Sequence, residues 1–342
     1  MAKTGPTKTT EVYHSIYGEN GCGKSPLAVC ARESLSFRSD FDVLCNGFCI
    51  AADETGGGMI CRGAGIPRHS SRKKTKHAFT MTWRVMSTID FGRHSEDYVE
   101  YRPGFPASFY QRIDAITRIR ASRSLDLATG PGTIALELAA RGSSVVGIDI
   151  SAELVATARR VSKQRNLEDN VHFRVARAEN TGLDANAFDL VTAGQCWHWF
   201  DSAAAMAETQ RVLRPGGVLA IAHYSYLAAH SPVARETEDL ILAFNPSWSM
   251  ASSAGIFPEL IDEVIHGGFS LVEQFCYQHD EAFSHVRWRG RIRTCNGVGS
   301  GGLSPSEVQR FDEALSRLLR RKYPDPMLVT HRVWCVVARK PS

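Results

Sequence analysis

The chain has 342 residues and a formal net charge of +4, with 43% hydrophobic and 22% charged residues. This length accommodates two ordinary domains or one large domain with insertions, and the composition is typical of a soluble globular protein. No apolar run reaches the roughly 18–20 residues that a membrane span needs, and no signal-peptide pattern follows Met1. We therefore expect a cytoplasmic protein without membrane association.

Residues 1–87 differ in composition from the rest of the chain. They hold 12 basic and 7 acidic residues, and five of the nine cysteines lie in the first 61 positions. Because the basic excess is confined to this segment, the body carries no electrostatic footprint for nucleic acid. With no sustained helical or strand period, residues 1–87 are predicted to be a disordered or non-native leader before a domain at 88–342.

One motif in this leader is a nominal phosphate-binding loop. Residues 18–25 satisfy the pattern G-x-x-x-x-G-K-S, in which backbone N–H groups bind phosphate. Pro26 stands where the following helix should donate its N–H groups, which disfavours a nucleotide site. The leader cysteines lack the paired C-x-x-C spacing of a zinc site, and the basic run 68–77 is typical of a solvated segment. We expect no metal in this protein.

The first motif of the domain is Tyr98-Val-Glu-Tyr-Arg102-Pro-Gly-Phe-Pro106. It resembles the segment Y-x-x-Y-R-P-x-Y-P that precedes the core in a branch of small-molecule methyltransferases, with Phe105 where that branch usually has Tyr. The resemblance implies that Tyr98 and Arg102 cover the cofactor. Alternatively, they pack the following helix against the sheet.

Residues 124–142 predict a buried strand, a glycine turn and a helix: Ser-Leu-Asp-Leu-Ala-Thr-Gly-Pro-Gly-Thr-Ile-Ala-Leu-Glu-Leu-Ala-Ala-Arg-Gly. Gly130 and Gly132 let a ligand approach the backbone, and the helix N-terminus points at the turn. The pattern G-x-G-x-x-A fits a dinucleotide such as NAD. The acid at Asp126, four residues before Gly130, indicates another ligand. With this acid the stretch resembles the first motif of class I S-adenosylmethionine (SAM)-dependent methyltransferases, and the resemblance implies that SAM is the cofactor.

Two later strand ends add acidic residues that suit a ribose and an adenine. Residues 144–151 predict a buried strand that ends in Asp149, whose carboxylate suits the two ribose hydroxyls in both NAD and SAM enzymes. The family resemblance implies an acid after the third strand, against the adenine amino group. Here Arg177 stands at the commoner acidic position. The adenine contact is therefore assigned to Glu179 or to the backbone around Ala178.

Residues 188–201, Phe-Asp-Leu-Val-Thr-Ala-Gly-Gln-Cys-Trp-His-Trp-Phe-Asp, closely resemble a motif of the same methyltransferase branch. Gln195 can hydrogen-bond the ligand, and the indoles of Trp197 and Trp199 can shield a sulfonium through cation–π contact. His198 is a candidate general base or, alternatively, a buried histidine bonded to the backbone. In an extended chain the indoles would face one way and the imidazole the other, and a tight turn would lift that restriction.

The C-terminal part has the element order of the same family. A helix over 202–213 is followed by Arg-Pro-Gly-Gly, a strand at 218–223 and a last strand at 327–338. The resemblance implies that the last two strands form a hairpin with an antiparallel seventh strand. It also implies that segments near 225–268 and 279–326 build a lid. The arginines of residues 287–293 fit a carboxylate substrate, with Arg287 as the candidate, or are solvated.

Together these motifs predict a class I SAM-dependent methyltransferase. The expected α/β fold is a Rossmann-like, seven-stranded, mostly parallel sheet with helices on both faces and a reversed C-terminal hairpin. The expected activity is methyl transfer from SAM to a small molecule, such as a carboxylate or a hydroxyl. The alternatives are an NAD-dependent oxidoreductase and a SAM-binding regulatory protein. The acceptor and the oligomeric state stay open. The predicted cofactor-binding residues are Tyr98, Arg102, Asp126, Ala128, Thr129, Gly130, Pro131, Gly132, Asp149, Ile150, Ala178, Glu179 and Gln195.

Overall fold

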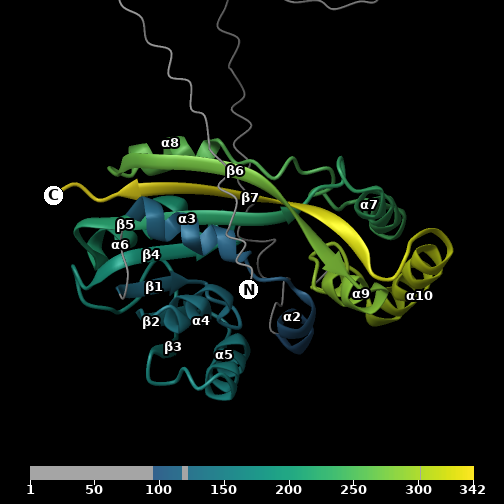
Figure 1. The fold of residues 1–342 in the computed structure, drawn as a ribbon, viewed down its shortest axis with the longest axis horizontal. Helices are drawn as coiled ribbons and strands as arrows, with labels where there is room; N and C mark the ends of the chain where they lie inside the picture. Colours follow the sequence, from purple (N-terminus) through teal and green to yellow (C-terminus); the bar gives the residue numbers. More distant parts are fainter. Residues whose placement is uncertain (1–94, 118–121, 301) are drawn as a thin grey trace, which may run out of the picture. The chain divides into compact units, whose positions relative to one another are not determined.

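A seven-stranded sheet in the order β3-β2-β1-β4-β5-β7-β6 lies at the centre of the fold (Figure 1). The computed structural model describes residues 95–342 except 118–121 and 301. Strands β1 to β5 pair in parallel, whereas β7 is antiparallel to both β5 and β6. The predicted sheet and its reversed hairpin are confirmed. The strands are β1 Arg123–Leu127, β2 Ser144–Asp149, β3 Val171–Val175, β4 Phe188–Gly194, β5 Leu213–Tyr226, β6 Ser270–Phe283 and β7 Met327–Arg339.

The leader prediction for residues 1–87, with its phosphate-binding-loop motif, lies outside the described residues. Within the described ranges, no helix is long and apolar enough to cross a membrane. The same ranges contain no group of three or more His, Cys, Asp or Glu side chains that could hold a metal ion.

Helices cover both faces of the sheet. One apolar cluster joins the sheet to α3 (Ala107–Thr117), α4 (Thr133–Ala140) and α5 (Ala152–Gln164). A second joins the opposite face to α6 (Ser202–Val212) and α8 (Glu259–His266). Central strand β4 is buried on both sides, because Leu190 belongs to the first cluster and Val191 and Ala193 to the second. A nearly continuous apolar strand is expected at the centre of a parallel sheet.

A third apolar cluster lies where the long β6–β7 hairpin runs beyond the rest of the sheet. It joins Phe283 of β6 and Met327 of β7 to α7 (Pro232–Phe244), α9 (His285–Arg293) and α10 (Pro305–Lys322). Figure 1 shows these three helices gathered at that end of the hairpin. Trp288 of α9 is fully buried there. The short helix α2 (Ser95–Tyr101) contacts α9.

One predicted boundary differs from the observed one. Helix α6 ends at Val212 and the next strand begins at Leu213, so the Arg-Pro-Gly-Gly segment belongs to β5. Arg214 precedes a proline and is therefore excluded from helical geometry. Gly216 has a φ of 73° and lies within the register shift of the β4–β5 pairing, between the pairs Phe188–Leu213 and Leu190–Val218.

Candidate cofactor and acceptor pocket

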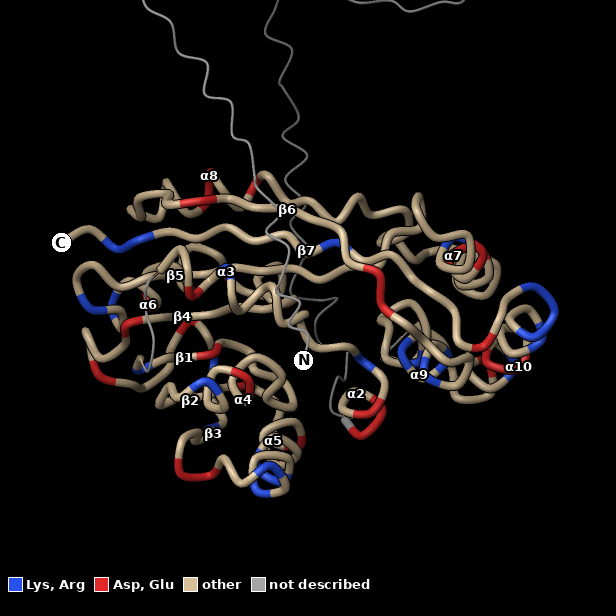
Figure 2. Tube along the Cα trace, in the orientation of Figure 1, with Lys and Arg blue, Asp and Glu red and all other residues tan. Residues whose placement is uncertain are grey.

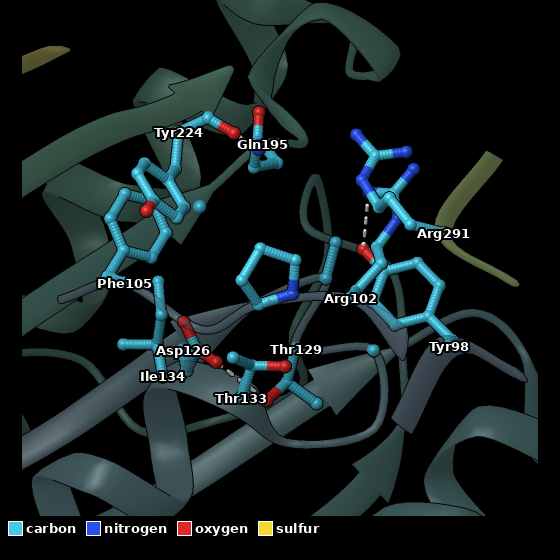
Figure 3. Close-up of a pocket in the computed structure, with 14 residues that line it drawn as sticks. Tyr98, Arg102, Phe105, Asp126, Thr129, Thr133, Ile134, Gln195, Tyr224 and Arg291 are labelled. Carbon is cyan, nitrogen blue, oxygen red and sulfur yellow. Dashed lines mark hydrogen bonds between the residues drawn. The ribbon is translucent and has the colours of Figure 1, made fainter. Parts of the chain in front are cut away.

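A pocket of about 580 Å³, including the space open to solvent, lies at the carboxyl ends of β1 and β4. Figure 3 shows Asp126 and Thr129 on one side of it, Gln195 and Tyr224 on another, and Arg102 and Arg291 on a third. Three parts of the chain therefore meet around one space: the glycine turn, the end of β4 and the α2–α9 contact.

The turn after β1 leaves its backbone accessible. Ala128, Gly130 and Gly132 all have left-handed φ values, of 45°, 57° and 91°. A Cβ on Gly132 would lie 2.9 Å from the Phe173 ring, so the turn can pack on β3 only with glycine there. Gly132 is the residue before the first turn of α4, whose free N–H groups point toward the pocket side. The turn thus fits a polar, nucleotide-like ligand.

Asp126 is a buried carboxylate that lines the pocket. It is 2% exposed, and it accepts hydrogen bonds from the hydroxyls of Thr129 at 2.6 Å and Thr192 at 2.7 Å. Burial raises the pKa of Asp126 to about 6, although both hydroxyl bonds act in the opposite direction. A carboxylate in this position suits a cationic or hydrogen-bond-donating part of a ligand.

Asp149 is fixed beside the turn by the backbone. One of its oxygens accepts from the N–H of Gly130 and the other from the N–H of Ser151, each at 2.9 Å. Burial raises the pKa of Asp149 above its ordinary value, and these backbone bonds oppose the rise. The side chain of the next residue, Ile150, is 62% exposed. The end of β2 therefore presents a positioned carboxylate next to an uncovered apolar side chain.

The end of β4 supplies a strained polar residue. Gln195 has a φ of 64°, which is uncommon for a residue with a side chain, and such strain is concentrated at functional sites. Its side-chain amide donates to the carbonyl of Tyr224 on β5. Gly194 lines the same wall, and a Cβ there would collide with Ile134 of α4.

The predicted adenine contacts lie away from this pocket. Ala178 is buried, and the Glu179 carboxylate pairs with Arg177 at 3.3 Å and accepts from the N–H of Asp201 at 3.1 Å. Both oxygens of Glu179 are therefore engaged within the protein, and the adenine assignment stays a prediction.

Residues 197–199 form a short 3₁₀ turn, η2 (Trp197–Trp199), so the chain is not extended there. Trp197 is 1% exposed and donates to Glu263 of α8 at 3.0 Å. His198 is exposed, and Trp199 is half-buried. Surrounding protein atoms lower the pKa of His198, but the access of solvent to its ring limits this fall. None of the three residues lines the pocket.

Arg102 and Arg291 lie on the α2–α9 side of the pocket (Figure 3). Arg102 donates to the Tyr98 hydroxyl and to the Thr294 hydroxyl, both at 3.0 Å. Arg291 is 8% exposed, and its guanidinium lies over the Tyr226 ring at 5.5 Å. Burial lowers the pKa of Arg291 to about 10, and the nearby charge of Arg102 adds to that effect.

Arg287, the predicted substrate contact, lies elsewhere. Its guanidinium binds Glu281 at 2.7 Å and the carbonyl of Ala282 at 2.8 Å, and it does not line the pocket. The ion pair explains this placement, because Arg287 projects toward β6. Of the two predicted lid segments, only the second contributes a pocket residue, and that residue is Arg291.

The structure thus brings part of the predicted set together. Seven predicted residues line the pocket: Tyr98, Arg102, Asp126, Ala128, Thr129, Gly130 and Gln195. Pro131 and Gly132 shape the turn, and Asp149 and Ile150 lie next to it. Among the lining residues that were not predicted are Phe105, Thr133, Ile134 and Tyr224. Arg291 belongs to the predicted arginine group of residues 287–293, in which Arg287 was the candidate, and it is the member of that group that lines the pocket.

Comparisons with known proteins agree with this fold. Residues 125–221 match the family model described as a methyltransferase domain. An uncharacterized methyltransferase of Mycobacterium tuberculosis is 36% identical over 142 residues, which are 42% of this chain and 54% of that protein. A demethylmenaquinone methyltransferase of Thermus thermophilus is 39% identical over 115 residues, 33% of this chain and 51% of that protein. The chain thus spans about half the length of the curated relatives it matches.

A solved structure of a proposed type II methyltransferase from Anaeromyxobacter dehalogenans superposes with a TM-score of 0.53 and 23% sequence identity. The superposition covers 71% of this chain and all of that one. At this identity it shows a shared fold. Over residues 125–221 the chain is therefore similar to a methyltransferase domain, and its described part has the fold of class I methyltransferases, whose cofactor is S-adenosylmethionine.

Proposed function

We propose that this protein transfers the methyl group of SAM to a small-molecule acceptor that carries a carboxylate or a hydroxyl. The observation that carries the proposal is the bond between Asp149 and the N–H of Gly130. It holds a carboxylate at the edge of an accessible glycine turn, where a ribose can be bound through both hydroxyls.

The neighbouring residues suit the other parts of SAM. Exposed Ile150 offers an apolar surface to an adenine ring. Asp126 suits the ammonium of the amino-acid part, and the Gln195 side chain suits its carboxylate. These residues bind and orient the cofactor. SAM itself supplies the electrophilic methyl.

The protein contributes mainly alignment. A methyl transfer needs the acceptor atom in line with the sulfonium–methyl bond, in a site that excludes water. A base is needed only when the acceptor must lose a proton. His198 stays our candidate, since burial lowers its pKa and keeps the imidazole neutral at pH 7. Because it lies outside the pocket lining, it would act only on an acceptor that extends past that lining.

Two measurements test the proposal. Calorimetric titration with S-adenosylhomocysteine (SAH) and, separately, with NAD should give binding of the first alone. Transfer of labelled methyl from SAM to members of a panel of small carboxylates and phenols should then be detected. Binding of NAD without SAH would overturn the cofactor assignment. SAH binding with no transfer to any acceptor would favour a regulatory role.

A further inference from the structure

Arg291 is a buried cation without a carboxylate partner among the described residues. It is 8% exposed, and its Nη1 atom has no hydrogen-bond partner. The other arginines of α9 are paired: Arg287 with Glu281 at 2.7 Å, Arg289 with Asp312 at 3.0 Å, and Arg293 with Asp97 at 3.2 Å. Figure 2 shows this concentration of basic residues along α9. Arg291 alone of these four lines the pocket.

Burying an unpaired guanidinium costs free energy of folding, and a bound anion would offset that cost. The Tyr226 ring lies under Arg291 at 5.5 Å and offers only a cation–π contact. The nearby Arg102 raises the electrostatic cost of burying the Arg291 charge. Its own positive charge is not neutralised, because its hydrogen bonds go to neutral groups, the Tyr98 hydroxyl and Thr294. Two cations thus line the same pocket without an acidic group between them (Figure 3).

We propose that Arg291, with Arg102 beside it, binds a carboxylate of the methyl acceptor, which makes the acceptor a small organic acid. This inference rests on the proposed methyl transfer. A guanidinium presents parallel N–H donors that match a carboxylate, and burial strengthens such a bond.

The carboxylate has two chemical sources, the acceptor and the amino-acid part of SAM. SAM carries a sulfonium and an ammonium against one carboxylate, so its net charge is positive. Its single carboxylate cannot neutralise two guanidiniums, so one positive charge is left for the acceptor. An anionic acceptor can neutralise that charge, and it would bind better once SAM is present. Arg291 also comes from α9, outside the β1–β5 region that carries the glycine turn, as expected for a residue that selects the acceptor.

The test uses the full chain saturated with SAH. Small acids (citrate, malonate, fumarate and benzoate), their amides and inorganic phosphate are each screened for a rise in melting temperature and then titrated. We expect at least one acid to bind and its amide not to bind. Arg291→Met should raise the dissociation constant of that acid at least 30-fold while changing the SAH dissociation constant less than twofold. Arg289→Met, which loses a paired arginine of the same helix, should leave both constants within twofold.

Folding and cofactor binding are checked in the same variants. Arg291→Met replaces a buried charge by an apolar chain of similar length, so its melting temperature without ligand should not fall below that of the wild type. SAH is compared with 5′-methylthioadenosine, which lacks the amino-acid part. If Arg291→Met weakens SAH and spares methylthioadenosine, Arg291 binds the cofactor carboxylate and the inference is wrong. It is also wrong if no acid binds the SAH complex, or if phosphate alone does. Failure of SAH to bind the wild type would overturn the proposed function itself.

Discussion

Asp126 makes the protein's stability depend on pH. Burial raises its pKa from 3.8 to about 6, so the folded protein holds this proton more tightly than the unfolded chain. The resulting stabilisation is complete below pH 4 and is lost as the pH rises through 6. The difference of about two pKa units corresponds to about 3 kcal/mol. Asp126→Asn should therefore be more stable than the wild type at pH 7.5 by up to that amount and close to it at pH 4.

Urea unfolding without ligand at both pH values measures this difference. The two threonine hydroxyls that contact Asp126 can donate to or accept from an amide, so the variant keeps its hydrogen bonds. If the free energy of unfolding of Asp126→Asn falls between pH 4 and 7.5 by as much as that of the wild type, another group causes the pH dependence.

Asp149 should contribute to cofactor affinity. Asp149→Ala removes the acceptor for two ribose hydroxyls and should weaken SAH binding by about 1.5–3 kcal/mol, the scale of charge-assisted hydrogen bonds. Calorimetry measures the dissociation constant. Asp169→Ala, at an exposed position between α5 and β3, is the matched control and should leave it unchanged. Equal SAH affinity in Asp149→Ala and the wild type would remove the ribose assignment.

Residues such as Asp126 and Asp149 could be predicted from the sequence because their setting is local: a strand, a turn and a helix start within a few positions. The orientations of the Trp197 and His198 side chains could not be predicted in this way. Their orientation depends on the 3₁₀ turn and on Glu263, which binds the Trp197 indole from 66 residues away along the chain. No periodicity near residue 197 reveals that partner.

At the scale of elements, the contact between α2 and α9 positions the two pocket arginines. Gly290 of α9 packs directly against the Tyr101 ring, and a Cβ there would overlap it. Arg102, the next residue, bonds Thr294 at the end of α9. The sequence did not predict this contact, because the partners are 192 positions apart. It did predict the strands, whose apolar runs and turns are continuous in the chain.

Gly290→Ala tests the role of this contact. Alanine favours helix over glycine by about 1 kcal/mol, so a net loss of stability reports the clash with Tyr101. We expect the free energy of unfolding to fall by about 1–3 kcal/mol, as in overpacked cores, and SAH affinity to fall with it. Val286→Ala, at a position of α9 that is 59% exposed, should stay within about 0.5 kcal/mol of the wild type. A Gly290→Ala protein as stable as the wild type would mean that α2 can move without cost.

At the scale of the molecule, two separate parts of the described fold form the pocket. Its floor is the carboxyl edge of the parallel strands, where class I methyltransferases share their motifs. Its cationic side depends on α9, which the long β6–β7 hairpin and the third apolar cluster hold beyond the sheet. The floor therefore comes from the parallel strands, whereas the cationic side comes from Arg102 after α2 and Arg291 of α9.

The last prediction concerns residues 1–85. Residues 1–87 show no sustained helical or strand period, and the part of the chain that the structure describes already supplies a pocket lining between Tyr98 and Arg291. A shortened chain that begins at Met86 should therefore keep the free energy of unfolding within about 0.5 kcal/mol and the SAH dissociation constant within twofold. Urea unfolding and calorimetry on both chains measure this. An insoluble shortened chain, or one that fails to bind SAH, would make the leader part of the domain. Specific ATP binding by the full chain that disappears on shortening would instead assign a function to the Gly18–Ser25 motif.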